Sequence, residues 1–182
     1  ATWEGMGDCI GNIKSENIKI FETRADFNIN ELDIKAYSIP HDASDPVGYS
    51  FRVGNKKVCI ATDLGYFSDE VKLNIRQSDM VLLEANHDIE MVKVSNYPYF
   101  LKRRILSDVG HLSNEAAGRA VLELMDTGVK TVLLGHLSKE NNFPELAYQT
   151  VKGILEENKV VIGKDIDLDV APRRGVSRYY DI

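Results

Sequence analysis

The fold of this chain is set by residues 80–87, which have the sequence MVLLEANH. Residues 80–83 are continuously apolar and Glu84 ends the run, a pattern typical of a strand buried on both faces of a sheet. Residues 131–134, TVLL, form a second such run, which Gly135 and His136 follow. In open α/β sheets, ligands bind beyond the carboxyl ends of the strands, so we expect functional side chains at these two ends.

The segments around the two runs alternate between extended and helical patterns. Residues 49–53 and 57–62 are β-rich and flank Gly54-Asn55-Lys56, which predicts a hairpin. Ser68, Ser113 and Pro144 each precede or open a stretch with apolar residues at helical spacing. We also predict a short helix within 1–16 and strands at 17–23, 32–39, 167–171 and 176–180. The pattern predicts an α/β fold with a mixed sheet and flanking helices, in a single domain of residues 1–182.

Composition narrows the class of protein. A length of 182 residues with 43% hydrophobic and 27% charged residues suits one globular domain. The net charge of −6 gives no overall attraction to nucleic acid, so phosphate binding must be local. The two cysteines, Cys9 and Cys59, have no metal-ligand spacing. We find no signal peptide and no apolar run that could cross a bilayer, and we predict a cytoplasmic protein without a membrane partner.

The four histidines all fall outside the predicted helices and strand interiors. His41 precedes the hairpin, His87 and His136 follow the two buried runs, and His111 opens a helix in a Gly-His-Leu-Ser turn. One such histidine is more often solvated than functional. Several at one edge of a sheet favour a metal site, because imidazole is a common ligand of zinc-type cations.

Carboxylates join this edge. A hairpin that turns at Gly54-Asn55 sets residue 63 opposite residue 46, so Asp63 emerges at the same end as His41. Glu84 closes its own strand there. Asp63 could instead cap the turn that follows it, and Glu84 with His87 could form an ordinary surface pair. Together with the histidines, they predict a site for a divalent cation.

A basic cluster lies between these groups, at Lys102, Arg103 and Arg104. Such side chains position phosphates in nucleic-acid complexes, although a solvated basic patch has the same sequence pattern.

The order of these motifs resembles the metallo-β-lactamase superfamily, and within it the YycJ/WalJ branch, with RNase Z as a more distant relative. The longest and most specific of the resembling stretches is 102–115. The stretches are 40–43 (PHDA), 48–51 (GYSF), 61–65 (ATDLG), 84–88 (EANHD), 102–115 (KRRILSDVGHLSNE) and 136–142 (HLSKENN). The resemblance implies a metallo-β-lactamase-like αββα sandwich.

The resemblance also implies roles for individual residues. Two divalent cations, zinc or manganese, would be bound, and basic residues would contact phosphate. His41 resembles a ligand of the first metal, Asp63 the carboxylate that bridges both metals, and His136 a terminal ligand of the second. His111 resembles the general acid, and Glu84 and His87 match a Glu-Ala-x-His motif with supporting or proton-shuttling roles. The phosphate would be positioned by Lys102, Arg103 and Arg104.

The implied activity is hydrolysis of a phosphodiester by a hydroxide held between two cations. The branch is associated with 5′-to-3′ DNA exonuclease activity, so DNA is favoured over RNA as the nucleic-acid partner. Two alternatives stay open: a thioester or lactam hydrolase of the same fold, and a non-catalytic interaction module.

The sequence departs from the family at one motif. No His-x-His-x-Asp-His segment is present, and the chain begins with Ala1 rather than Met. We therefore expect the carboxyl-terminal portion of the fold, truncated at its amino terminus. Such a portion should bind metal weakly, should not hydrolyse substrate alone, and should form a homodimer through an exposed sheet face.

Overall fold

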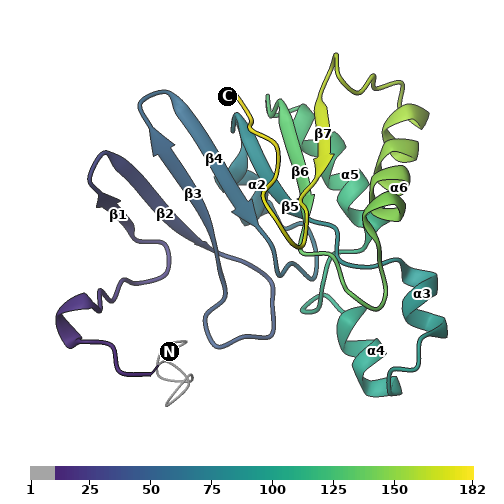
Figure 1. The fold of residues 1–182 in the computed structure, drawn as a ribbon, viewed down its shortest axis with the longest axis horizontal. Helices are drawn as coiled ribbons and strands as arrows, with labels where there is room; N and C mark the ends of the chain where they lie inside the picture. The colour runs from purple at the N-terminus through teal and green to yellow at the C-terminus, as the bar shows by residue number, and fades with distance from the viewer. Residues whose placement is uncertain (1–10) are drawn as a thin grey trace.

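The structure, a computed structural model, describes residues 11–182 (Figure 1). Seven strands form one mixed sheet in which the spatial order follows the sequence. The first four are antiparallel and the last four, from β4 onwards, are parallel. The strands are β1 (Asp26–Ile29), β2 (Leu32–Ser38), β3 (Val47–Val53), β4 (Lys56–Ala61), β5 (Met80–Glu84), β6 (Thr131–Gly135) and β7 (Asp167–Val170).

Helices connect the parallel strands. Ser68 and Ser113 cap two of them, accepting hydrogen bonds from the backbone N–H groups of Val71 and Ala116, as their positions in the sequence predict. The helices are η2 (Ser15–Asn17), α2 (Asp69–Ile75), α3 (Ile89–Val94), α4 (Tyr99–Ile105), α5 (Asn114–Met125) and α6 (Pro144–Glu157). The predicted α/β class with a mixed sheet and flanking helices is confirmed.

One face of the sheet carries the hydrophobic core. Alternate strand residues such as Cys59, Leu83 and Leu134 are fully buried there. They belong to one cluster with apolar residues of α2, α5 and α6, for example Val71 and Leu124. This face is dry because three amphipathic helices cover it.

The opposite face is only half-covered. It holds Tyr49, Phe51, Val58 and Ile60, which are neither fully buried nor fully exposed. The segment after β7 runs across this face, where Arg178 and Tyr180 both donate hydrogen bonds to Asp169 (Figure 1).

The parallel pairing brings three strand ends to one edge. Ala61 at the end of β4 pairs with Leu83, and Glu84 at the end of β5 pairs with Gly135 of β6. Helices α3 and α4 lie beyond this edge, away from the layer formed by α2, α5 and α6 (Figure 1). Among residues 11–182, no helix is both long and apolar enough to cross a membrane.

Several local predictions are wrong. Residues 17–23 form no strand, and Ile20 is 86% exposed, because β1 takes the place beside β2. Residues 176–180 form none either, since side-chain bonds to Asp169 hold this segment in place of a backbone ladder. Helices α3 and α4 were not predicted, being too short to show a period. The helix expected within 1–16 falls largely on residues 1–10, outside the described chain.

Candidate metal centre

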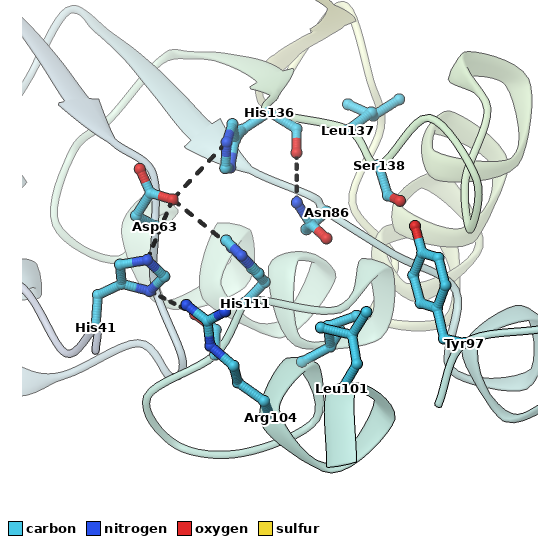
Figure 2. A pocket seen from close by; sticks show the side chains of 12 residues that line it. His41, Asp63, Asn86, Tyr97, Leu101, Arg104, His111, His136, Leu137 and Ser138 are labelled. Carbon is cyan, nitrogen blue, oxygen red and sulfur yellow. Dashed lines mark hydrogen bonds and ion pairs between the residues drawn. The ribbon is translucent and has the colours of Figure 1, made fainter. Parts of the chain in front are cut away.

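Five of the predicted site residues line one pocket of about 470 Å³ beyond the strand ends: His41, Asp63, His111, His136 and Arg104 (Figure 2). Asp63 follows β4 and His136 follows β6. His41 comes from the loop between β2 and β3, and His111 from the segment between α4 and α5. The proximity expected from the hairpin register is thereby confirmed for His41 and Asp63, whose Nε2 and Oδ1 atoms are 3.6 Å apart.

Each of the three pocket imidazoles is fixed through its Nδ1 atom. The Nδ1 atom of His41 lies 2.9 Å from the carbonyl oxygen of Gly110. The Nδ1 atoms of His111 and His136 lie 2.8 Å and 2.7 Å from Oε1 of Glu84. Because both acceptors are oxygens, each Nδ1 donates a proton, and Nε2 is left with its lone pair free in the neutral ring. This tautomer suits metal binding through Nε2.

Asp63 lies at the centre of the histidines (Figure 2). Its Oδ1 atom is 3.6 Å from Nε2 of His41 and 3.8 Å from Nε2 of His136, too far for hydrogen bonds. Two ligands at about 2.0–2.2 Å from one cation in a tetrahedral arrangement lie roughly 3.4 Å apart, a similar separation. The spacing and the nitrogen and oxygen donors therefore fit divalent cations held between Asp63 and His41 and between Asp63 and His136.

Glu84 is the buried support of this cluster. Its side chain is 0% exposed, and it accepts hydrogen bonds from the backbone N–H of Leu64 at 2.5 Å and, more weakly, of Leu112 at 3.4 Å. With the two imidazoles, all of its acceptor directions are used, so it orients His111 and His136. One ligand atom each from Asp63, Glu84, His111 and His136 can be chosen so that all lie within 4.8 Å of one another.

These contacts shift two pKa values. Burial raises the pKa of Glu84, but the hydrogen bonds from His111 and His136 outweigh it, so the pKa lies below its ordinary value. The hydrogen bond to Glu84 raises the pKa of His136, partly against the effect of burial. Protons therefore compete with a cation for His136 at low pH.

Close backbone packing holds the loop that carries His111. A Cβ atom on Gly110 would lie 2.2 Å from the carbonyl oxygen of Arg104, and one on Gly65 would lie 2.1 Å from that of Asp108. The amide of Asp42 donates to Val109 across the same contact. Glycine at 65 thus lets this loop pack against the loop of Asp63, and glycine at 110 lets it fold back on the end of α4.

The basic cluster divides in two. Arg104 lines the pocket, and its Nε and Nη2 atoms both donate to the carboxylate of Asp42. Lys102 and Arg103 do not line it: Nζ of Lys102 donates to the carbonyl of Lys93, and Arg103 lies 5.9 Å from the ring of Tyr99. The predicted phosphate contacts of all three stay predictions.

His87 does not reach the pocket. Its side chain is 1% exposed, its backbone pairs with Ser113, and Nδ1 has no hydrogen-bond partner among the described residues. Burial lowers the pKa of His87. The sequence placed His87 on the shared edge; it lies behind it because the chain folds inward after Glu84 to meet α5. Its supporting or proton-shuttling role is untested.

The sequence did not identify the wall opposite His41. Tyr97 enters the pocket from the segment between α3 and α4, and Ser138 from the loop after β6 (Figure 2). Leu101 of α4 and Asn86, whose amide donates to the carbonyl of His136, complete that side. Nothing in the spacing of these residues distinguishes them from ordinary loop positions.

Comparison with known proteins gives the wider context. Residues 6–137 match the model of the β-lactamase superfamily domain. The chain is 37% identical over 173 residues to the exodeoxyribonuclease YycJ of Bacillus anthracis, and 37% identical over 174 residues to the exodeoxyribonuclease WalJ of Streptococcus pneumoniae. Each match covers 94% of this chain, which spans 66% of the first relative and 65% of the second.

Solved structures share the fold at lower identity. The metallo-β-lactamase fold protein YhfI of Bacillus subtilis superposes with a TM-score of 0.59 and 15% identity, over 83% of this chain and 50% of that one. Zn²⁺-bound PqqB of Methylobacterium extorquens gives a TM-score of 0.54 and 15% identity, over 83% and 48%. With the family match over most of its length, the chain belongs to the β-lactamase superfamily.

Proposed function

We propose that these residues serve a metal-dependent hydrolase that cleaves the phosphodiester bonds of DNA in the 5′-to-3′ direction. The observation that carries the proposal is the set of three imidazoles whose Nδ1 atoms are all hydrogen-bonded, with Asp63 between them. The names of the two exodeoxyribonucleases support the substrate class. Because this chain spans about two thirds of their length, the activity is proposed for a protein that long.

His41, Asp63 and His136 would hold two divalent cations, zinc or manganese, with Asp63 between them. Cations in such a site supply a reactive hydroxide near neutral pH and neutralise charge on phosphoryl oxygens. The chain's own contribution is orientation. Gly110 fixes the ring of His41, and Glu84 fixes that of His136.

His111 would act as the general acid. Its Nδ1 donates to buried Glu84, which fixes the orientation of the ring. The proton on Nε2 would then pass to the oxygen of the leaving nucleotide, a transfer that typically contributes about 10²–10⁴-fold to the rate. Arg104 and its neighbours Lys102 and Arg103 would attract the phosphate backbone.

Three broader expectations belong to the same proposal. We propose that residues 1–182 form a single domain, because one sheet extends from Asp26 to Val170. The cytoplasmic location and the preference for DNA over RNA stay predictions. We also propose a homodimer through the half-covered sheet face at Tyr49 and Phe51, and a monomeric mass by light scattering at high concentration would contradict it.

The decisive experiment measures shortening of 3′-labelled, 5′-phosphorylated DNA from its 5′ end, with and without Mn²⁺ or Zn²⁺. Two proteins are compared: the chain 1–182, which we expect to be inactive alone, and the same chain joined to the part of the Bacillus anthracis relative that it does not match. In the fusion, His111→Ala should reduce turnover by about 10²-fold or more with unchanged metal content. Loss of metal in this variant would instead make His111 a ligand, and turnover of a thioester or lactam in place of DNA would contradict the proposal.

A further inference from the structure

We propose that the outer surface of α4 binds unpaired nucleobases of the substrate by stacking on Tyr99 and Phe100. This inference rests on the proposed function, because the surface of α4 would bind the nucleic-acid strand whose cleavage is proposed for the pocket of the candidate metal centre. The two rings are 75% and 73% exposed, an unusual state for large aromatic side chains.

The position of Phe100 links the surface to the pocket. Leu101, Arg104 and Ile105 of α4 line the pocket wall. Residues three and four apart are neighbours on a helix, so Phe100 lies beside Arg103 and Arg104. A strand that leaves the pocket over Arg104 therefore meets Phe100 first.

Tyr99 extends the surface by one more ring. The guanidinium carbon of Arg103 lies 5.9 Å from the centroid of the Tyr99 ring, within the range of a cation–π contact. A cation beside an exposed aromatic face is the arrangement that single-strand binding proteins use, with phosphate beside the cation and the base on the ring.

The charge of the segment favours nucleic acid as the occupant. The chain has a net charge of −6, yet residues 93–104 (KVSNYPYFLKRR) hold four basic residues and no acidic one. Lys93 is paired with Glu90 and Arg104 with Asp42, whereas Lys102 and Arg103 have no ion pair among the described residues. A polyanion with flat, apolar bases complements both properties of this surface, and a neutral protein surface would complement only one.

The test measures binding by the chain 1–182 in EDTA, which prevents hydrolysis. Fluorescence anisotropy compares a labelled ten-nucleotide oligothymidylate with an abasic strand of equal length and charge. We expect the base-bearing strand to bind more tightly, and Tyr99→Ala or Phe100→Ala to weaken it roughly tenfold each. Binding of the abasic strand should change little. Tyr179→Ala is the matched control, because Tyr179 is 91% exposed in the segment after β7.

A second variant gives a readout that a merely structural role would not alter. Phe100→Trp should retain affinity for the base-bearing strand. The unmodified chain has one tryptophan, Trp3, so the fluorescence that the variant adds comes from position 100. This added fluorescence should be quenched by the base-bearing strand and not by the abasic one.

The outcomes separate this inference from the proposed function. Equal affinity for both strands, or unchanged binding in the Tyr99 and Phe100 variants, would overturn the stacking surface while leaving nuclease activity of the fusion protein intact. No binding of either strand, together with no hydrolysis by the fusion, would overturn both. Binding of phosphatidylglycerol vesicles through the two rings, with no preference for bases, would identify a membrane surface and also overturn the inference.

Discussion

Oδ1 of Asp63 lies 3.8 Å from Nε2 of His136, and both residues have left-handed backbones, with φ of 60° and 54°. Residues other than glycine seldom adopt this conformation, which costs roughly 1–2 kcal/mol each. Asp63, two residues beyond β4, and His136, directly beyond β6, thus hold their side chains toward each other at the expense of stability. Such strain is found at functional sites, where the rest of the fold supports it.

Replacing Asp63 should therefore separate stability from metal binding. Asp63→Gly relieves the backbone strain, and we expect the free energy of unfolding of the metal-free chain to rise by about 1 kcal/mol in urea denaturation. Affinity for Zn²⁺, measured by calorimetry on the fusion protein described above, should be lost. Lys159→Gly is the control, since Lys159 is exposed with φ of 63° at the end of α6. It should gain stability and keep metal binding; an unchanged Zn²⁺ affinity in Asp63→Gly would contradict the assignment.

Glu84→Gln should weaken metal binding although Glu84 need not touch the cation. An amide cannot accept from both imidazoles and two backbone N–H groups, so the rings of His111 and His136 lose their fixed orientation. Mutations of such supporting groups typically cost about 10–100-fold in metal affinity. Calorimetric titration of the fusion protein with Zn²⁺ measures the change. Glu140→Gln, at an exposed position, should have no effect, and equal affinities of the two variants would show that Glu84 does not orient the site.

Gly110→Ala should disturb the site through the backbone. The added Cβ atom would lie 2.2 Å and 2.3 Å from the carbonyl oxygens of Arg104 and Ile105, which cannot move as a side chain could. We expect a loss of about 1–3 kcal/mol in the free energy of unfolding, and weaker metal binding because Gly110 holds the ring of His41. Gly153→Ala on α6, where a Cβ meets nothing within 4 Å, should be neutral or stabilising.

His87 should make the chain less stable in mild acid. Burial lowers its pKa in the folded state, so between the folded value and the unfolded value near 6.5 the unfolded chain binds more protons. The contribution of neutral His87 to the free energy of unfolding is thus fully present above about pH 6.5. It falls as the pH drops through the folded pKa of His87, by at most about 1.4 kcal/mol per pH unit for one proton.

His87→Gln removes this contribution. Urea denaturation of the metal-free chain at pH 7.5 and 5.5 should show a smaller acid-induced loss in the variant than in the wild type. Comparing slopes avoids the constant cost of the substitution itself, and also the opposite effect of His136, whose raised pKa favours the folded state at low pH. Parallel slopes would mean that His87 does not titrate in this range.

The salt dependence of oligonucleotide binding should distinguish two neighbouring arginines. Each phosphate neutralised contributes about 0.7 to the slope of log K against log salt for single strands. Arg103→Gln should lower the slope by about this amount. Arg104→Gln should change it less, because Asp42 already binds Nε and Nη2 of Arg104. A larger change for Arg104 would indicate that the ion pair opens when DNA binds.

The sequence predicted those site residues whose positions follow from the pattern of strands and turns. The apolar runs before Glu84 and His136 and the hairpin at Gly54-Asn55 locate strand ends, and strand ends locate side chains. The sequence did not predict which side chains are buried behind the pocket and which reach it, because tertiary packing determines this. Nothing in residues 84–88 indicates that Glu84 supports two rings while His87, three residues later, is buried behind them.

The pocket wall was unpredictable for a related reason. Helices α3 and α4 have six and seven residues, too few for an apolar period, and their position depends on contacts such as that of Arg104 with Asp42. Arg104 and Asp42 are 62 residues apart in the chain, and a single sequence does not show that such distant residues are in contact.

A single oxygen atom, Oε1 of Glu84, anchors both His111 and His136. In the proposed mechanism His136 binds a cation and His111 donates a proton, so both functions depend on the same oxygen atom of Glu84. A shift of that carboxylate would therefore disturb the hydrogen bonds of both rings at once. A change that displaces this carboxylate should therefore alter cation binding and proton transfer together, whereas His111→Ala should alter proton transfer alone.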